Sequence, residues 1–189
     1  MNPKIIILLG TSGSGKGTQA KLLQEKLALD YMGSGDMLRE RKNIDDFTGR
    51  KIKDILERGG FVASAVIFKL WVDKWEKIRN KSEFRGFIID GSPRKLPEAT
   101  LIDQSLEWYE WDKYLKALLV DISREEAFSR LSKRGREDDT ESSINSRLDL
   151  FEEEVVPIIE YYEKSNRLTR VNGEQSIEDV HKDIMKAIR

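Results

Sequence analysis

A glycine-rich segment near the start of the chain carries the clearest chemical signal in the sequence. It reads Gly10-Thr11-Ser12-Gly13-Ser14-Gly15-Lys16-Gly17-Thr18 and directly follows the apolar run Lys4–Leu9. The apolar run predicts a buried strand, and residues 20–27 predict a helix. Glycines let the backbone turn its N–H groups inward, and a helix N-terminus adds partial positive charge. The segment therefore predicts a phosphate-binding loop, with Lys16 as the point charge for the terminal phosphates.

This loop departs from the general pattern at one position. The pattern places Ser or Thr immediately after the lysine, where the hydroxyl contacts Mg²⁺, whereas here Gly17 follows Lys16 and Thr18 comes next. The Gly-Lys-Gly-Thr-Gln variant resembles the nucleoside monophosphate kinases, adenylate kinase in particular. The resemblance implies that Mg²⁺ enters with ATP and is held largely by nucleotide oxygens and waters.

The segment Gly33-Ser34-Gly35-Asp36-Met37-Leu38-Arg39 has two interpretations. Ser34 or Asp36 is a suitable helix cap, with Arg39 as a solvated side chain. The segment also resembles the start of the monophosphate-binding part of adenylate kinase. That resemblance places Ser34, Gly35 and Arg39 at the acceptor nucleotide, where the planar guanidinium suits a phosphate. It further implies that the insert ends near residues 58–62, where Gly60, Phe61 and Val62 line the acceptor base.

A buried strand is predicted at Gly86–Asp90, and it ends in the turn Gly91-Ser92-Pro93-Arg94. Ligands of open α/β sheets bind beyond the carboxyl ends of the strands, so Asp90 and Arg94 indicate the region of the site. The resemblance assigns Asp90 to the waters around Mg²⁺ and Arg94 to the acceptor phosphate, with Gly91, Ser92 and Pro93 beside it. Adenylate kinases usually have Phe where this chain has Ser92.

Four arginines, Arg130, Arg134, Arg136 and Arg147, form a further cluster. A charge-rich helix end is the ordinary interpretation, but phosphoryl transfer needs positive charge spread over several oxygens. The resemblance places Arg130 at the donor base and the other three at phosphates, and it places the backbone near Gln175 at the donor adenine. Only Gly135 separates Arg134 from Arg136, so the predicted lid is very short and holds no zinc-bearing extension.

Glu98 determines how the acceptor base is predicted. Adenylate kinases usually have Gln in this position, where the amide both donates to and accepts from the adenine edge. An ionised Glu98 accepts from the amino group of adenine but donates nothing to a ring nitrogen. It also suits the amino group of cytosine, or the ring N–H and amino group of guanine. AMP is the favoured acceptor, with CMP or UMP as the alternative and GMP also open.

Composition narrows the class of protein. The 189 residues contain 33 Lys plus Arg and 34 Asp plus Glu, so the net charge of −1 gives no support for nucleic-acid binding. The absence of cysteine excludes disulfides and thiolate zinc sites. No apolar run reaches the roughly 18 residues of a membrane span. We expect a cytoplasmic protein without a membrane partner, and a monomer.

Strand-like runs alternate with helical stretches along the whole chain. The strands are expected at Lys4–Leu9, about 29–32, Gly86–Asp90, Lys116–Asp121 and Leu168–Val171. This alternation predicts an α/β fold, and the resemblance implies a P-loop NTPase-like, five-stranded parallel sheet with helices on both faces.

One domain spans 1–189 in this prediction. Its core covers 1–32, 63–129 and 141–189, its monophosphate-binding insert about 33–62, and its lid about 130–140. Pro157 predicts a kink near Val155 in the helical pattern of 142–164. The tryptophans, paired as Trp71 with Trp75 and Trp108 with Trp111, are expected to be packing residues.

The hypothesis for activity is reversible transfer of the γ-phosphoryl group of Mg-ATP to AMP. The resemblance makes Lys16, Arg94, Arg134, Arg136 and Arg147 the catalytic residues, acting by alignment and charge stabilisation. It assigns ATP binding to Gly13, Ser14, Gly15, Lys16, Gly17, Thr18, Arg130, Arg134 and Gln175. A nucleotide-binding module without kinase activity is the alternative from another class, and it would have no need of Arg39, Arg94 or residues 58–62.

Overall fold

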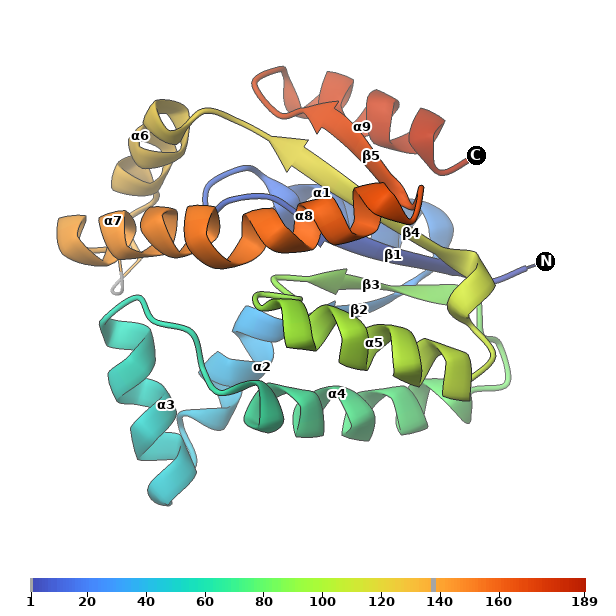
Figure 1. The fold of residues 1–189 in the computed structure, drawn as a ribbon, viewed down its shortest axis with the longest axis horizontal. Helices are drawn as coiled ribbons and strands as arrows, with labels where there is room; N and C mark the ends of the chain where they lie inside the picture. The colour runs from blue at the N-terminus through green and yellow to red at the C-terminus, as the bar shows by residue number, and fades with distance from the viewer. Residues whose placement is uncertain (1, 137–138) are drawn as a thin grey trace.

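A five-stranded parallel sheet forms the centre of the molecule (Figure 1). The computed structural model describes residues 2–136 and 139–189. The strands stand in the order β2-β3-β1-β4-β5. Their bounds are β1 Lys4–Leu9, β2 Asp30–Gly33, β3 Gly86–Asp90, β4 Leu115–Asp121 and β5 Leu168–Asn172. The predicted α/β class and the five parallel strands are confirmed.

The central strand β1 is buried on both of its faces. Successive side chains of a strand point to opposite sides, so Ile5, Ile7 and Leu9 enter one apolar cluster while Ile6 and Leu8 enter another. This double burial explains why β1 reads as a continuous apolar run instead of an alternating one.

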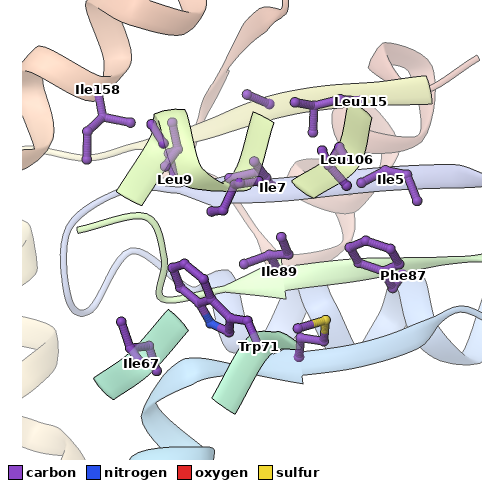
Figure 2. Close-up of a cluster of buried hydrophobic side chains, with 14 of the residues drawn as sticks. Ile5, Ile7, Leu9, Ile67, Trp71, Phe87, Ile89, Leu106, Leu115 and Ile158 are labelled. Carbon is purple, nitrogen blue, oxygen red and sulfur yellow. The ribbon is translucent and has the colours of Figure 1, made fainter. Parts of the chain in front are cut away.

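Helices cover both faces of the sheet. The helices α1 (Lys16–Leu27) and α9 (Ile177–Ala187) pack on the side of Ile6 and Leu8. The opposite side is covered by α4 (Ser64–Arg79), α5 (Leu96–Trp108) and α8 (Val156–Lys164). In Figure 2, Trp71, Leu106 and Ile158 from these three helices surround Ile5, Ile7, Phe87 and Ile89 of the strands.

Four further helices lie toward the end of the sheet to which the strand arrows point (Figure 1). Their bounds are α2 Ser34–Arg41, α3 Phe47–Glu57, α6 Arg124–Arg134 and α7 Glu141–Leu150. Side-chain caps start three of them: Asp46 accepts from the amide of Gly49, Ser123 from that of Glu126, and Thr140 from that of Ser143. The helix α2 begins at Ser34 with no side-chain cap, so Ser34 and Asp36 do not serve as its N-cap. A 3₁₀ turn at Asp112–Tyr114 leads into β4.

The distortion predicted near Val155 is a π-helical segment. Residues Phe151–Val155 form this wider turn between α7 and α8, and Pro157 lies in the first turn of α8. Proline has no N–H and its ring collides with the carbonyl four residues earlier, so a regular helix is not continued through it. The π-helical turn accommodates the proline between α7 and α8.

The packing prediction holds for three tryptophans and is wrong for Trp108. Trp71 and Trp75 are 0% exposed and Trp111 is 3% exposed, whereas Trp108 is 82% exposed. Trp108 is the last residue of α5, so the helical spacing to Trp111 does not exist in the structure. Leu106 faces the core, and two residues further round the helix the side chain points away from it.

The core position of Leu106 gives a first prediction. Leu106→Ala removes a fully buried side chain between α5 and the sheet, and we expect the free energy of unfolding to fall by about 2 to 5 kcal/mol. Leu96→Ala, on the same helix at a side chain that is 40% exposed, should cost about 1 kcal/mol or less. Urea unfolding followed by tryptophan fluorescence measures both. Equal losses would contradict the assignment of this core.

Candidate active site

A cavity of about 1020 Å³ opens at the carboxyl ends of the strands. Its lining brings together segments that lie far apart in the sequence, from the glycine-rich loop to the turn after β5. Every residue predicted for the site lines this cavity except Pro93, which follows Ser92 through a cis peptide bond. The lining residues that were predicted are Gly13, Ser14, Gly15, Lys16, Gly17, Thr18, Ser34, Gly35, Arg39, Gly60, Phe61, Val62, Asp90, Gly91, Ser92, Arg94, Glu98, Arg130, Arg134, Arg136, Arg147 and Gln175.

The glycine-rich loop leads directly into the N-terminus of α1. Gly13 and Gly15 have φ values of 86° and 93°, a region that side-chain-bearing residues rarely adopt, so the loop needs glycine there. Lys16 is the first residue of α1, and its Nζ donates to the carbonyl oxygens of Gly10 and Thr11, both at 2.6 Å. The loop is therefore closed around its own lysine, at the positive end of a helix.

The Lys16 ammonium is held in a confined place. The residue is 7% exposed, and burial lowers the pKa of Lys16 to about 7, although the charge of Asp90 opposes that shift. A phosphate oxygen that enters the loop supplies the negative charge that restores the protonated form. The arrangement suits an anionic ligand.

Asp90, at the end of β3, faces the loop. Its Oδ2 lies 3.6 Å from the position that a Cβ on Gly17 would occupy, so the carboxylate stands beside the start of α1. The Tyr31 hydroxyl donates to Asp90 Oδ2 at 3.0 Å and lies 3.3 Å from Asp36 Oδ2. Burial, then the two carboxylates, raise the pKa of Tyr31, so its hydroxyl stays protonated.

Asp90 fits a magnesium ion that enters with a nucleotide. Within residues 2–136 and 139–189, no group of three or more His, Cys, Asp or Glu is arranged to hold a metal ion. Asp90 nevertheless brings a carboxylate oxygen, the ligand type that Mg²⁺ and its waters prefer, beside Gly17 at the start of α1. A single carboxylate suits an ion whose remaining ligands are phosphate oxygens and water.

Two arginines define the part of the cavity around α2 and the turn after β3. Arg39 pairs with Asp36 at 2.5 Å on α2. The Nε of Arg94 donates to the carbonyl oxygen of Gly91 at 2.9 Å, and its guanidinium lies 5.1 Å from the centre of the Phe61 ring. The ring and the carbonyl hold the Arg94 side chain in one orientation, which is the preorganisation that anion binding needs.

Glu98 is engaged by internal partners that the sequence did not indicate. The residue is 2% exposed, its Oε1 accepts from Ser64 Oγ at 3.0 Å, and its Oε2 accepts from the Arg94 amide at 2.7 Å. Burial raises the pKa of Glu98, and these two hydrogen bonds oppose the shift without cancelling it. The backbone of Lys95 adds a further hydrogen bond to the carboxylate, and Glu98 lines the cavity.

The opposite end of the cavity is built on α6 and the turn after β5. Arg130 pairs with Glu126 at 2.6 Å and donates to the carbonyl oxygen of Gly173 at 3.1 Å. Gln175 donates to the carbonyl oxygen of Asn172 at 2.9 Å, which closes the same turn. Arg130 and the turn of Gln175 thus form one wall of the cavity.

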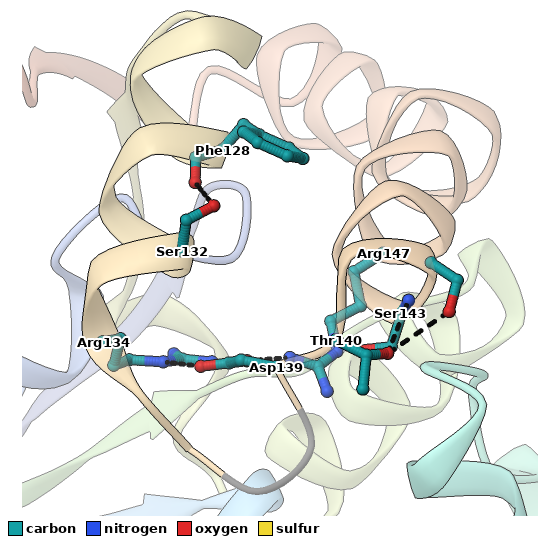
Figure 3. A network of polar contacts seen from close by, with 8 residues as sticks. Phe128, Ser132, Arg134, Asp139, Thr140, Ser143 and Arg147 are labelled. Carbon is teal, nitrogen blue, oxygen red and sulfur yellow. Dashed lines mark hydrogen bonds and ion pairs between the residues drawn. The ribbon is translucent and has the colours of Figure 1, made fainter.

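Asp139 joins two of the predicted catalytic arginines. Its side chain is 1% exposed and accepts from both nitrogens of one edge of Arg134, at 2.7 and 2.6 Å, and from Arg147 at 2.7 Å. Figure 3 shows the three side chains in one line between α6 and α7. Burial disfavours the charge, but hydrogen bonds from Arg134 and Arg147 outweigh it and hold the pKa of Asp139 below its ordinary value.

Sequence analysis did not predict that Tyr31, Asp36, Ser64 and Asp139 form contacts that hold site residues in place. Only Asp139 had a usable signal, an acidic run directly between arginines. Tyr31 and Ser64 have no motif, because their partners come from other elements. The binding and catalytic roles of the predicted residues stay predictions.

The fold and the cavity define a class of protein. A phosphate-binding loop between β1 and α1, with arginines and an aspartate around one cavity at the strand ends, is the architecture of a nucleotide-binding phosphotransferase.

Known proteins place the chain within that class. The family model for adenylate kinase matches residues 8–167. The chain is 33% identical to "Adenylate kinase" of Prochlorococcus marinus (strain MIT 9211), over 97% of this chain and 96% of that protein. It is 32% identical to "Adenylate kinase" of Corynebacterium urealyticum, over 97% and 98% of the two chains. It is also 33% identical to "UMP-CMP kinase 1" of Oryza sativa subsp. japonica, over 97% of this chain and 73% of that protein.

The chain belongs to the adenylate kinase family. It is an ATP-binding phosphotransferase with the nucleoside monophosphate kinase activity of that family. No helix in the described part of the chain is both long and apolar enough to span a bilayer.

The buried Asp139 gives a second prediction. Asp139→Asn keeps the shape but removes the charge between Arg134 and Arg147, and we expect the free energy of unfolding at neutral pH to fall by about 1.5 to 3 kcal/mol. Because the folded pKa lies below the ordinary 3.8, this stabilisation is complete above that value and is lost as the pH falls through the folded pKa. The natural protein and Asp139→Asn should therefore differ less in their free energy of unfolding below about pH 4.

Urea unfolding across the pH range measures this difference. The matched control is Asp54→Asn, which breaks the ion pair with Arg58 between side chains that are 55% and 77% exposed. That change should stay within about 0.5 kcal/mol. A loss for Asp139→Asn no larger than the control would show that the buried charge does not organise the arginines.

Proposed function

We propose that the protein transfers the γ-phosphoryl group of Mg-ATP reversibly to AMP and so forms two molecules of ADP. One observation carries the proposal. The phosphate loop lines the same cavity as the residues predicted to bind the acceptor nucleotide, apart from Pro93. A plain ATPase needs the loop but not Arg39, Arg94 and residues 60–62 on the other side. Two nucleotide sites that face each other account for both halves.

ATP binds at the loop, with its phosphates against the N–H groups at the start of α1 and the Lys16 ammonium. Its base lies toward Arg130 and the turn of Gln175, which form the far wall. Mg²⁺ bound with ATP neutralises phosphate charge, and Asp90 holds waters of that ion.

AMP binds with its phosphate between Arg39 and Arg94. Arg94 is already oriented by Gly91 and Phe61, so little reorganisation is needed when the phosphate arrives. Arg39 exchanges its pairing with Asp36 for the incoming phosphate. The acceptor group is ribose-linked phosphate, which is an anion at neutral pH.

The chemical step is an in-line displacement. An oxygen of the AMP phosphate forms a bond to the γ-phosphorus as the bond from that phosphorus to the β–γ bridging oxygen breaks, and the electron pair stays on ADP. The nucleophile is already anionic, so no general base is required. Lys16, Arg94, Arg134, Arg136 and Arg147 stabilise the charge that spreads over the transferred group. We propose that the insert 33–62 and the lid 130–140 close over the cavity and exclude water.

The environment of Glu98 supports adenine as the acceptor base. A protonated carboxyl group donates one hydrogen bond and accepts another, as the amide of Gln does. Burial favours that neutral form, and Glu98 lines the cavity. In its neutral form Glu98 donates to the ring nitrogen of adenine and accepts from its amino group, whereas the ionised form donates nothing.

A pyrimidine monophosphate is the second candidate acceptor. One relative at 33% identity is named UMP-CMP kinase 1. Cytosine presents the same pair of groups as adenine, an amino group beside an unprotonated ring nitrogen. Guanine presents two donors and so matches the ionised form of Glu98.

The acceptor assay tests the function directly. ADP formation from Mg-ATP is measured by a coupled assay with AMP, CMP, UMP, GMP and no acceptor. We expect AMP to give the highest kcat/KM. If another monophosphate is the best acceptor, the protein is still a kinase but acts on that base. If ADP forms at the same rate without any acceptor, the two-site arrangement is contradicted.

Glu98 gives a prediction with a pH signature. The raised pKa of Glu98 means that the neutral form persists to higher pH than for an ordinary glutamate, and ionisation then removes the donor to adenine. We expect the KM for AMP to rise with pH in the natural protein and to stay flat in Glu98→Gln, whose amide does not titrate. The KM for ATP is the internal control and should follow the same pH course in both proteins. A flat AMP profile in the natural protein would contradict this role of the proton.

A further inference from the structure

Tyr31 and Gly33 occupy the same face of β2. Side chains alternate along a strand, so these two residues point toward the α1 side of the sheet while Met32 points to the other. In the parallel register, Tyr31 stands beside Ile88 and Gly33 stands beside Asp90. To reach Asp90, the Tyr31 ring must therefore run forward along its own strand and pass over Gly33.

Gly33 leaves the space through which the ring passes. A Cβ built on Gly33 would lie 2.5 Å from the Tyr31 hydroxyl oxygen and 2.6 Å from a ring carbon. The backbone angles of Gly33, φ −82° and ψ 101°, are accessible to any residue, so conformation does not demand glycine there. Glycine is needed there because the Tyr31 ring occupies the space that a side chain at position 33 would fill.

The hydroxyl ends between two carboxylates of the cavity. Its single proton is donated to Asp90 Oδ2 at 3.0 Å, and Asp36 Oδ2 lies on the other side at 3.3 Å. Asp36 is paired with Arg39 and so has a cation of its own. Among the described residues, Tyr31 is thus the side chain that donates to Asp90 Oδ2.

We propose that Tyr31 is a positioning residue for phosphoryl transfer: its hydroxyl, reaching across Gly33, fixes the rotation of the Asp90 carboxylate that receives the waters of Mg-ATP. The inference rests on the proposed function for the role of Asp90. Groups that orient metal-associated carboxylates by hydrogen bonds set the metal affinity even though they do not touch the ion. Tyr31 and Gly33 act as one unit, since the tyrosine reaches Asp90 only where residue 33 has no side chain.

The first test is Tyr31→Phe, which keeps the ring and removes the hydroxyl. ATP binding is measured by titration calorimetry once with excess Mg²⁺ and once with EDTA. We expect the affinity gained from Mg²⁺ to fall about tenfold, while the affinity in EDTA stays within about twofold of the natural protein. The Mg²⁺ concentration for half-maximal activity should rise by a similar factor. A purely structural role would not separate the two binding conditions.

The second test uses the coupling between the two residues. Gly33→Ala places a methyl group where the phenol now lies, so the flexible tip of Tyr31 must move away from Asp90. We expect the same loss of Mg²⁺-dependent affinity as in Tyr31→Phe, and little further loss when Gly33→Ala is made in the Tyr31→Phe background.

Tyr109→Phe is the matched control. Its hydroxyl also donates to a carboxylate, that of Glu76, but neither residue lines the cavity. This variant should bind Mg-ATP and ATP in EDTA as the natural protein does. Thermal unfolding of all variants shows that they are folded at the temperature of the titrations.

Two results would overturn the inference. One is an unchanged Mg²⁺ effect in folded Tyr31→Phe, and the other is a full additional loss when Gly33→Ala is combined with Tyr31→Phe. Both readouts use ATP alone, so they remain decisive even if the acceptor assay rejects AMP. Failure of the proposed function appears in that assay, and failure of the Tyr31 role appears in the titrations.

Discussion

All five strands of the sheet run in the same direction, and the cavity depends on that constraint. Parallel strands bring their carboxyl ends to one edge, so the turns after β1, β2, β3, β4 and β5 meet there although they are distant in the sequence. The double burial of β1 holds this arrangement in place, because its isoleucines and leucines pack against helices on both sides. The phosphate loop thus starts from a strand that is buried on both faces.

The charged groups at this edge are held in a balanced network. Asp139 forms ion pairs with Arg134 and Arg147, and Asp36 forms one with Arg39. The carbonyl oxygen of Gly91 accepts a hydrogen bond from Arg94. Each pairing keeps an arginine extended toward the cavity and lowers the repulsion between neighbouring cations. The loop carbonyls hold Lys16 in the same way. The donors around the cavity are therefore already oriented, as the proposed electrostatic catalysis requires.

Glu98 and Tyr31 are polar residues whose positions depend on contacts between separate elements. Both are buried or half-buried polar groups whose partners come from other elements: Ser64 from α4 for Glu98, and Asp90 from β3 for Tyr31. Ser64 and Tyr31 belong to no motif, so these contacts were beyond prediction from the sequence. The exposure of Trp108 was missed for a related reason, since spacing along the chain does not say where α5 ends.

The sequence alone determined the strands, their order along the chain and the phosphate loop, because these depend on local patterns: apolar runs, glycines and the position of one lysine. The residues that the sequence indicated for the site all line the cavity, apart from Pro93. The roles of these residues, the limits of the insert and lid, the cytoplasmic location and the monomeric state stay predictions. Only the tertiary structure decided that Asp139 joins Arg134 to Arg147, that Glu98 is hydrogen-bonded internally and that Tyr31 reaches Asp90 across Gly33. Those contacts depend on how separate elements pack, and packing places side chains by distances in space that residue spacing does not encode.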